Sequence, residues 1–261
     1  MTFLPDRLKS NVLWAIALPV FAACCLLVWL ASFLLRGAAL ERTIKACCRL
    51  VLFLCGIRLD IEGRENFDPR RQYILMMNHV NFFDPLVLYA GYPGMARGVE
   101  EEGHFRWPVY GPTIRRLGVI PISRTDTPRA IASLERAAVL IRRRRDFSFA
   151  VFPEGTRTLD GRLGVFKRGG FHLAVETGLD ILPLVQVGAY RINHKGTRLI
   201  RPGRLRYVIG PAVPVSGFSK ENLNGLTDRV RSVFCQSLGD DPGPYPPGGE
   251  SGFHLLRREA K

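Results

Sequence analysis

The sequence predicts an α/β fold with a largely buried sheet, preceded by an N-terminal helical segment that anchors the chain in a membrane. From about residue 72 onward, short apolar runs with strand character alternate with segments of helical periodicity. This alternation is typical of α/β folds. Before it, residues 11–35 contain no charged side chain, and about 20 apolar residues are enough to cross a bilayer.

The N-terminal apolar stretch is compatible with two membrane arrangements. A helix that spans the bilayer competes with one that bends at Pro19 and enters a single leaflet. The positive-inside rule does not choose an orientation, because basic side chains flank both ends: Arg7, Lys9, Arg36, Arg42 and Lys45. A cleaved signal peptide is disfavoured, since its apolar region is usually about 7 to 15 residues long. A second apolar run, residues 46–57, suits an interfacial helix packed beside the first.

The elements after this segment follow in the order of a sheet covered by helices. Periodicity and composition predict strands at residues 72–77, 119–122, 147–152, 181–187 and 205–209. They predict helices at residues 85–90, 128–145, 169–177 and 223–238. The last residues, 240–261, are too rich in proline and glycine to bury a core, so we expect a flexible tail.

Charge and cysteine usage restrict the class of partner. The 261 residues carry a formal net charge of +14, which calls for a polyanionic partner, either nucleic acid or an anionic membrane surface. The apolar segment favours the membrane, and no nucleic-acid recognition motif is present. Five of the six cysteines lie in apolar segments without metal-ligand spacing, so we expect buried, reduced thiols and no metal site.

The first chemistry-bearing motif is NHVNFFDP, a His-x4-Asp pattern formed by His79 and Asp84. Five positions do not share one helix face, so the two side chains can meet only if the chain turns between them. Asp84 is a good N-cap residue and Pro85 a favoured first helical residue. There the Asp84 carboxylate can accept the Nδ1 proton of His79 and leave Nε2 free to act as a base.

The second motif, FPEGTR, follows the predicted strand 147–152 and contains Glu154, Gly155, Thr156 and Arg157. Gly155 allows a close backbone approach, and Arg157 offers a planar set of donors for a phosphate. Glu154 can accept a substrate hydroxyl or hold Arg157. A surface turn with one ion pair is the structural alternative.

Two further motifs add basic residues at comparable positions. Lys167 and Arg168 in FKRGGF precede a predicted helix start, which favours anions. Arg124 in GVIPISR follows the predicted strand 119–122. Ligands of open α/β sheets gather beyond the carboxyl ends of the strands, so these residues are expected to share one anion pocket.

Together, and in this order, NHVNFFD, GVIPISR, FPEGTR and ILPLVQVG resemble the 1-acyl-sn-glycerol-3-phosphate acyltransferase family, also called lysophosphatidic acid acyltransferases. The resemblance covers roughly residues 45–215. It departs from the family pattern in two places. Ser123 stands before Arg124 where the family has an acidic residue, and VEEEGHFRWP replaces a basic residue and a glutamate before the proline.

The resemblance implies a mixed sheet flanked by helices and a division into membrane-anchoring helices (residues 1–57), an acyltransferase catalytic domain (residues 58–239) and the tail (residues 240–261). It implies that His79 is the general base and that Asp84 orients it. Substrate contacts would come from the remaining motif residues: Asn78, Arg124, Glu154, Gly155, Thr156, Arg157, Lys167 and Pro183, the last on the acyl-chain side. The other histidines are interpreted as structural or exposed.

The implied reaction moves a fatty acyl group from acyl-CoA or acyl-ACP to the sn-2 hydroxyl of a lysophospholipid, 1-acyl-glycerol-3-phosphate, and forms phosphatidic acid in phospholipid biosynthesis, with no cofactor. The expected location is a bacterial inner membrane, with the catalytic domain on the cytoplasmic side. Two alternatives remain open. One is another acceptor, such as a lyso-ornithine lipid, and the other is a non-enzymatic, basic lipid-binding protein whose working surface includes residues 142–145.

Overall fold

The computed structural model describes residues 6–239, so the expected tail lies outside the described residues. At its centre is one sheet with the strand order β1-β7-β6-β2-β5-β3-β4. In chain order the strands are β1 (Ile57–Glu62), β2 (Ile74–Met77), β3 (Ala96–Glu101), β4 (Ile120–Ile122), β5 (Ser148–Val151), β6 (Ile181–Val187) and β7 (Gly203–Ile209). Neighbours pair in parallel, except that β6 and β7 are antiparallel. The sheet is therefore mixed, as expected.

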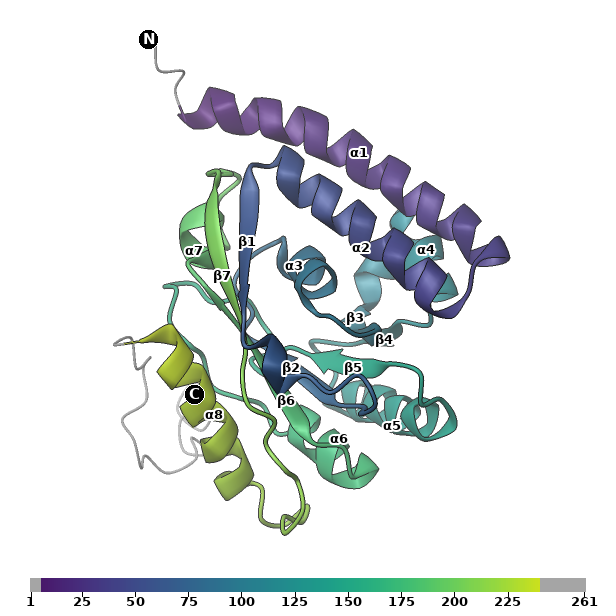
Figure 1. Ribbon diagram of the computed structural model, residues 1–261, viewed down its shortest axis with the longest axis vertical. Coiled ribbons are helices and arrows are strands. Elements are labelled where there is room, and N and C mark those ends of the chain that lie inside the picture. The colour runs from purple at the N-terminus through teal and green to yellow at the C-terminus, as the bar shows by residue number, and fades with distance from the viewer. Residues whose placement is uncertain (1–5, 240–261) are drawn as a thin grey trace, which may run out of the picture.

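Helices cover both faces of this sheet (Figure 1). One face carries α1 (Asp6–Leu34), α2 (Gly37–Leu54), α3 (Asp84–Gly91) and α4 (Tyr110–Arg116), and the other carries α5 (Thr127–Arg143), α6 (Gly169–Thr177) and α8 (Asn224–Leu238). A short α7 (Ala189–Ile192) follows β6, and 3-10 turns cover Arg64–Asn66 and Glu102–Arg106. Successive side chains of β2 point to opposite faces of the sheet and so belong to two hydrophobic cores. Leu75 and Met77 lie in one core, and Ile74 and Met76 lie in the other.

The strands and helices expected from residue 72 onward are present within a few residues of their predicted bounds, whereas α2, expected at residues 46–57, begins earlier, at Gly37. Four elements were missed. These are β1, β3, α4 and α7. The sequence of β3, ARGVEE, contains three charged residues and no apolar run, and that of α4 contains both glycine and proline. Pairing with β5 and β4 makes a strand of β3, so tertiary contacts override local propensity there.

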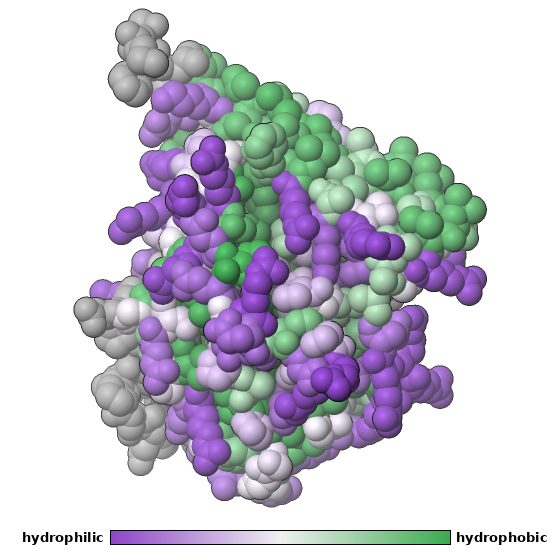
Figure 2. Space-filling model, in the orientation of Figure 1, coloured by the Kyte–Doolittle hydropathy of each residue, from purple (hydrophilic) through white to green (hydrophobic). Residues whose placement is uncertain are grey.

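Helices α1 and α2 form a hairpin whose outer side is apolar. Among residues 6–239, α1 is the single helix with the length and composition to cross a membrane, and only 22% of its most apolar window is buried in the protein. Figure 2 shows hydrophobic surface gathered over this helix, while the surface below is largely hydrophilic. The helix continues through Pro19, and α2 packs beside it, as expected for the second apolar run.

Polar contacts fix this hairpin to the sheet domain. Glu41, Lys45 and Arg49 are spaced four residues apart, so they share one face of α2. Lys45 Nζ donates to two backbone carbonyls of the α3–β3 loop at 2.6 and 2.7 Å, and Arg49 donates to a carbonyl of α3. Glu41, 3% exposed, pairs with the Arg97 guanidinium of β3 at 3.0 Å. The hairpin is therefore part of the folded unit.

Replacing Glu41 tests this attachment. We expect Glu41→Ala to lower the free energy of unfolding by about 3 kcal/mol, because it removes the ion-pair partner of the Arg97 guanidinium, whose side chain is only 13% exposed. The measurement is chemical denaturation in detergent. Asp60→Ala is the matched control, since its pair with Arg204 is solvent-exposed and should contribute at most about 1 kcal/mol. Equal losses in the two variants would contradict a special role for Glu41.

Candidate active site

The two motif loops meet because their strands are neighbours. Strand β2 pairs in parallel with β5, so the chain after Met77 and the chain after Val151 leave the sheet at the same edge. The backbone N–H of His79 donates to Glu154 Oε1 at 2.7 Å, which joins the two loops directly. The expectation that strand ends would assemble one site is met for these two motifs.

His79 and Asp84 form a buried pair. The distance from His79 Nδ1 to Asp84 Oδ2 is 2.6 Å, and the two residues are 8% and 0% exposed. The Asp84 carboxylate also accepts hydrogen bonds from the backbone N–H groups of Val80 and Asn81 and from Gln186 Nε2. Asp84 is the first residue of helix α3, and Phe83 takes the N-cap position that was expected for Asp84. The Asp84 carboxylate thus accepts hydrogen bonds from the loop that precedes α3 and holds that loop in a turn.

A hydrogen-bond network from β6 supports this pair, and sequence reasoning did not find it. The Gln186 side chain donates to Asp84 Oδ1 at 2.7 Å and to the Asn78 carbonyl at 2.9 Å. The Asn78 amide in turn bonds both the backbone N–H and the carbonyl of Gln186. The only sequence indication was a glutamine within the buried apolar strand ILPLVQV. Buried amides need such partners.

The His79 ring presents its second nitrogen to an open cavity. The ring stacks on Phe152 with centroids 4.4 Å apart and an interplanar angle of 22°. Within residues 6–239, no hydrogen bond to His79 Nε2 is present, and His79 lines a cavity of about 750 Å³. With Nδ1 directed at Asp84, Nε2 can accept a proton from a group bound in that cavity.

Glu154 does not hold Arg157, which was one of the two roles expected for it. Its carboxylate accepts the His79 and Gly164 backbone N–H groups at 2.7 and 2.8 Å, and it forms no pair with Arg157. Burial raises the pKa of Glu154 above its usual value, which the two backbone donors oppose. Glu154 is therefore tied to the His79 loop through the backbone N–H of His79.

Basic side chains gather at one end of the cavity. Arg124, Arg157 and Lys167 all line it, together with Gly155. Arg124 pairs with Glu101 at 3.0 Å, whereas the Arg157 and Lys167 side chains form no hydrogen bond or ion pair with the described part of the chain. Gly155 has a positive φ of 67°, and a Cβ there would approach Lys167 to 2.9 Å. Glycine thus brings this backbone close to the Lys167 side chain.

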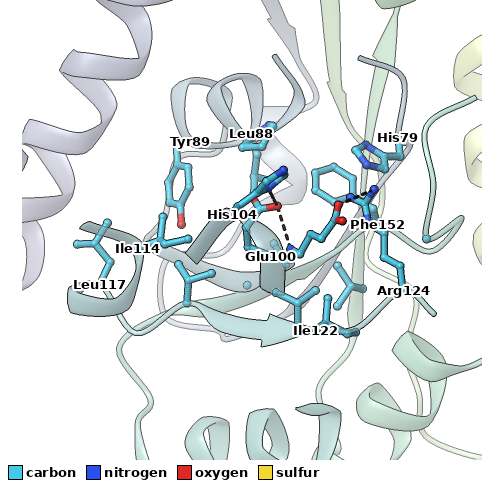
Figure 3. Close-up of a pocket in the computed structure, with 18 of the residues that line it drawn as sticks. His79, Leu88, Tyr89, Glu100, His104, Ile114, Leu117, Ile122, Arg124 and Phe152 are labelled. Carbon is cyan, nitrogen blue, oxygen red and sulfur yellow. Dashed lines mark hydrogen bonds and ion pairs between the residues drawn. The ribbon is translucent and has the colours of Figure 1, made fainter. Parts of the chain in front are cut away.

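The other end of the cavity is apolar and is closed by the helical hairpin. Helices α1 and α2 contribute Phe21, Cys24, Cys25, Val28, Cys47 and Cys48 to its wall. All six cysteines are free thiols, and the five of the hairpin region are buried, as expected. The cavity therefore joins a basic end beside the His79 loop to an apolar interior under the hairpin (Figure 3).

Four expected substrate-binding residues lie outside the cavity wall formed by residues 6–239: Asn78, Glu154, Thr156 and Pro183. Asn78 is buried in the network with Gln186, and Pro183 lies within β6, opposite Met76 of β2. Thr156 is exposed, and its hydroxyl accepts from Lys195. Two histidines that were interpreted as structural or exposed, His104 and His172, also line the cavity. His254 lies outside the described residues.

Comparisons with known proteins agree with the resemblance in the motifs. The acyltransferase family model matches residues 58–187. The 1-acyl-sn-glycerol-3-phosphate acyltransferase alpha of Mus musculus is 31% identical over 207 residues, which cover 76% of this chain and 72% of the relative. The Homo sapiens protein of the same name is 32% identical over 181 residues, 69% of this chain and 64% of the relative. The chain thus spans less than two thirds of the human relative's length.

A solved structure shares the fold. The crystal structure of the 1-acyl-sn-glycerophosphate (LPA) acyltransferase PlsC from Thermotoga maritima superposes with a TM-score of 0.74 at 24% identity, covering 89% of this chain and 96% of that one. Family model, relatives and fold converge on one assignment. The chain belongs to the 1-acyl-sn-glycerol-3-phosphate acyltransferase family.

Proposed function

We propose that this protein transfers a fatty acyl group from a thioester, acyl-CoA or acyl-ACP, to the sn-2 hydroxyl of 1-acyl-glycerol-3-phosphate, forming phosphatidic acid. The observation that carries the proposal is the His79–Asp84 pair at 2.6 Å, with Nε2 free of described partners and facing a cavity that has a basic end and an apolar interior. Such a cavity suits a lipid that has a phosphate at one end and a chain at the other.

The proposed chemistry is direct acyl transfer. His79 Nε2 takes the proton of the sn-2 hydroxyl while Asp84 stabilises the imidazolium that forms. The alkoxide oxygen attacks the thioester carbonyl carbon. The tetrahedral intermediate then collapses, the carbon–sulfur bond breaks, and the thiolate leaves and takes up the proton. The new bond is the ester at sn-2.

The basic residues are proposed to hold the acceptor phosphate. Arg157 and Lys167 have no described partner that competes for their donors, so an anion at this end of the cavity gains charge-assisted hydrogen bonds. Helix α6 begins at Gly169, and its first residues line the same end. Its N–H groups and dipole favour a negative charge there.

The hairpin is proposed to hold the enzyme at a membrane. Its outer side exposes large apolar side chains, including Leu27, Leu30, Phe33 and Phe53, and its inner side forms part of the cavity wall. A lysolipid could thus pass between bilayer and cavity without crossing water. We further place the catalytic domain on the cytoplasmic side of a bacterial inner membrane, where acyl-CoA and acyl-ACP are found.

Removing the proposed base should stop the reaction. We expect His79→Ala to lower kcat by about 100- to 10,000-fold, the range of general-base catalysis. Acyl transfer from labelled acyl-CoA to 1-acyl-glycerol-3-phosphate in lipid vesicles is the measurement. His194→Ala, which removes a ring stacked on Tyr190, is the control and should stay active. Near-normal turnover by a folded His79→Ala variant would rule out His79 as the base.

Removing a phosphate contact should affect binding of one acceptor selectively. Arg157→Ala is expected to raise the KM for 1-acyl-glycerol-3-phosphate by about tenfold or more, because one charge-assisted hydrogen bond contributes roughly 1.5 to 3 kcal/mol. The KM for a 1-acylglycerol, which has no phosphate, should change little. Arg70→Ala, at an exposed loop position, is the matched control. The same shift for both acceptors would refute the phosphate contact.

Because Gln186 bonds Asp84 and not the cavity, we expect a change at Gln186 to lower kcat rather than substrate affinity. Gln186→Met removes the hydrogen bonds to Asp84 and Asn78, so the carboxylate loses one of its restraints. We expect kcat to fall about tenfold, with KM within a factor of two. Gln72→Met is the control, because Gln72 likewise donates two hydrogen bonds, but to the Arg144 and Phe147 carbonyls of the α5–β5 loop. A comparable loss of kcat in the control would show that stability alone is responsible.

A further inference from the structure

A polar cluster interrupts the apolar wall of the cavity. Tyr89 of α3, Glu100 at the end of β3, His104 in the following 3-10 turn and Tyr110 at the start of α4 all line it. None of them belongs to the His79 pair or to the basic end. Glu100 and His104 lie within VEEEGHFRWP, where this chain departs from the family pattern, whereas Tyr89 and Tyr110 lie outside that stretch.

His104 is held in one orientation. Its Nδ1 lies 2.7 Å from Glu100 Oε1, and the Tyr110 hydroxyl donates to Glu100 Oε2 at 3.2 Å. The His104 ring lies against Trp107, with centroids 4.4 Å apart. Burial acts to raise the pKa of Glu100, but the hydrogen bond and charge of His104 outweigh it and hold this pKa below its usual value. The remaining nitrogen, Nε2, forms no hydrogen bond within residues 6–239.

Tyr89 brings a second polar group with no described partner. Its hydroxyl forms no hydrogen bond within residues 6–239, and Figure 3 shows it directed into the cavity on the side of Ile114. Burial raises the pKa of Tyr89 well above its usual value, so this group stays a neutral hydroxyl. The Glu100 charge also acts on Tyr89. The phenol lines the same cavity as the Glu100–His104 pair.

An unsubstituted lipid chain would not suit this wall. It would cover the Tyr89 hydroxyl and His104 Nε2 and leave both without a hydrogen bond, at a cost of affinity for each. A hydroxyl group on the chain would avoid this, because it can donate and accept at once. A hydroxyl on the lipid chain can therefore form a hydrogen bond with the Tyr89 hydroxyl, which also donates and accepts, and with His104 Nε2 whether or not that nitrogen carries a proton.

We propose that Tyr89 and His104, with Glu100 and Tyr110 fixing the imidazole, form a subsite for a hydroxyl group carried on a lipid chain inside the cavity. This inference rests on the proposed function, since it concerns either the acyl chain that the enzyme transfers or the chain already present on the acceptor. The hydroxyl can belong to the donor's acyl chain or to the chain already present on the acceptor. Both sources present the same group to the same two side chains.

The test compares matched lipids with and without a hydroxyl. One arm uses hexadecanoyl-CoA and a series of monohydroxyhexadecanoyl-CoA isomers as donors. The other uses 1-acyl-glycerol-3-phosphate with a plain or a monohydroxylated chain. For each probe, kcat/KM is divided by that of its plain counterpart. For at least one isomer, Tyr89→Phe and His104→Leu should lower this ratio about threefold to tenfold, the contribution of one hydrogen bond. The arm in which the ratio changes identifies the source.

Tyr207→Phe is the matched control. It also removes one phenolic oxygen, from a buried hydroxyl without a partner in the described chain and outside the cavity wall, and it should leave every ratio unchanged. The proposal is overturned if wild type, Tyr89→Phe and His104→Leu give the same ratios for all isomers in both arms.

A binding measurement separates this proposal from the proposed function. The same probes are titrated into the full-length His79→Ala protein and into His79→Ala/Tyr89→Phe, both of which should turn them over at least about 100-fold more slowly than wild type. Tighter binding of a hydroxylated probe that depends on Tyr89 supports the subsite even if wild type transfers no acyl group, in which case the proposed reaction alone fails. Transfer by wild type without any Tyr89-dependent preference, in binding or turnover, overturns the subsite and leaves the proposed reaction standing.

Discussion

The arrangement of this site depends on how one buried carboxylate is satisfied. Asp84 is completely buried and accepts hydrogen bonds from His79, from two backbone N–H groups of the preceding loop and from Gln186. A buried charge is tolerated only when it is hydrogen-bonded and paired in this way. These bonds orient the imidazole, close the loop between β2 and α3, and tie both to β6. The hydrogen bonds to Asp84 thus determine both the local fold and the geometry proposed for catalysis.

Much of this site follows from the order of motifs and strands. Parallel strands deliver their carboxyl ends to one edge, so His79 and the FPEGTR loop could be placed together from the sequence. The contacts of Glu154 and Gln186 could not, because they depend on which backbone group lies within hydrogen-bond distance after folding. Strand β3 was also missed, since its charged residues become strand only by pairing with neighbours. Local propensity carries no information about such partners.

The basic and the apolar side chains that line the cavity lie at different ends of it. Basic side chains and the start of α6 surround one end, and the hairpin closes the other with aromatic, aliphatic and thiol groups. The polar cluster around His104 was invisible in the sequence, where a single histidine among charged residues resembles a surface position. The structure instead places the His104 ring in the wall of the cavity, with Nδ1 paired to Glu100.

The attachment of the hairpin has a mechanical consequence. Ser10 and Trp14 near the start of α1 bond the Arg198 carbonyl, and the Arg116 guanidinium bonds Ser32 near its end. A helix held at both ends cannot swivel independently of the sheet. If α1 is embedded in lipid, a bilayer of different thickness would tilt the whole body as one piece. Lipid composition would then set the angle at which the cavity mouth meets the headgroup layer.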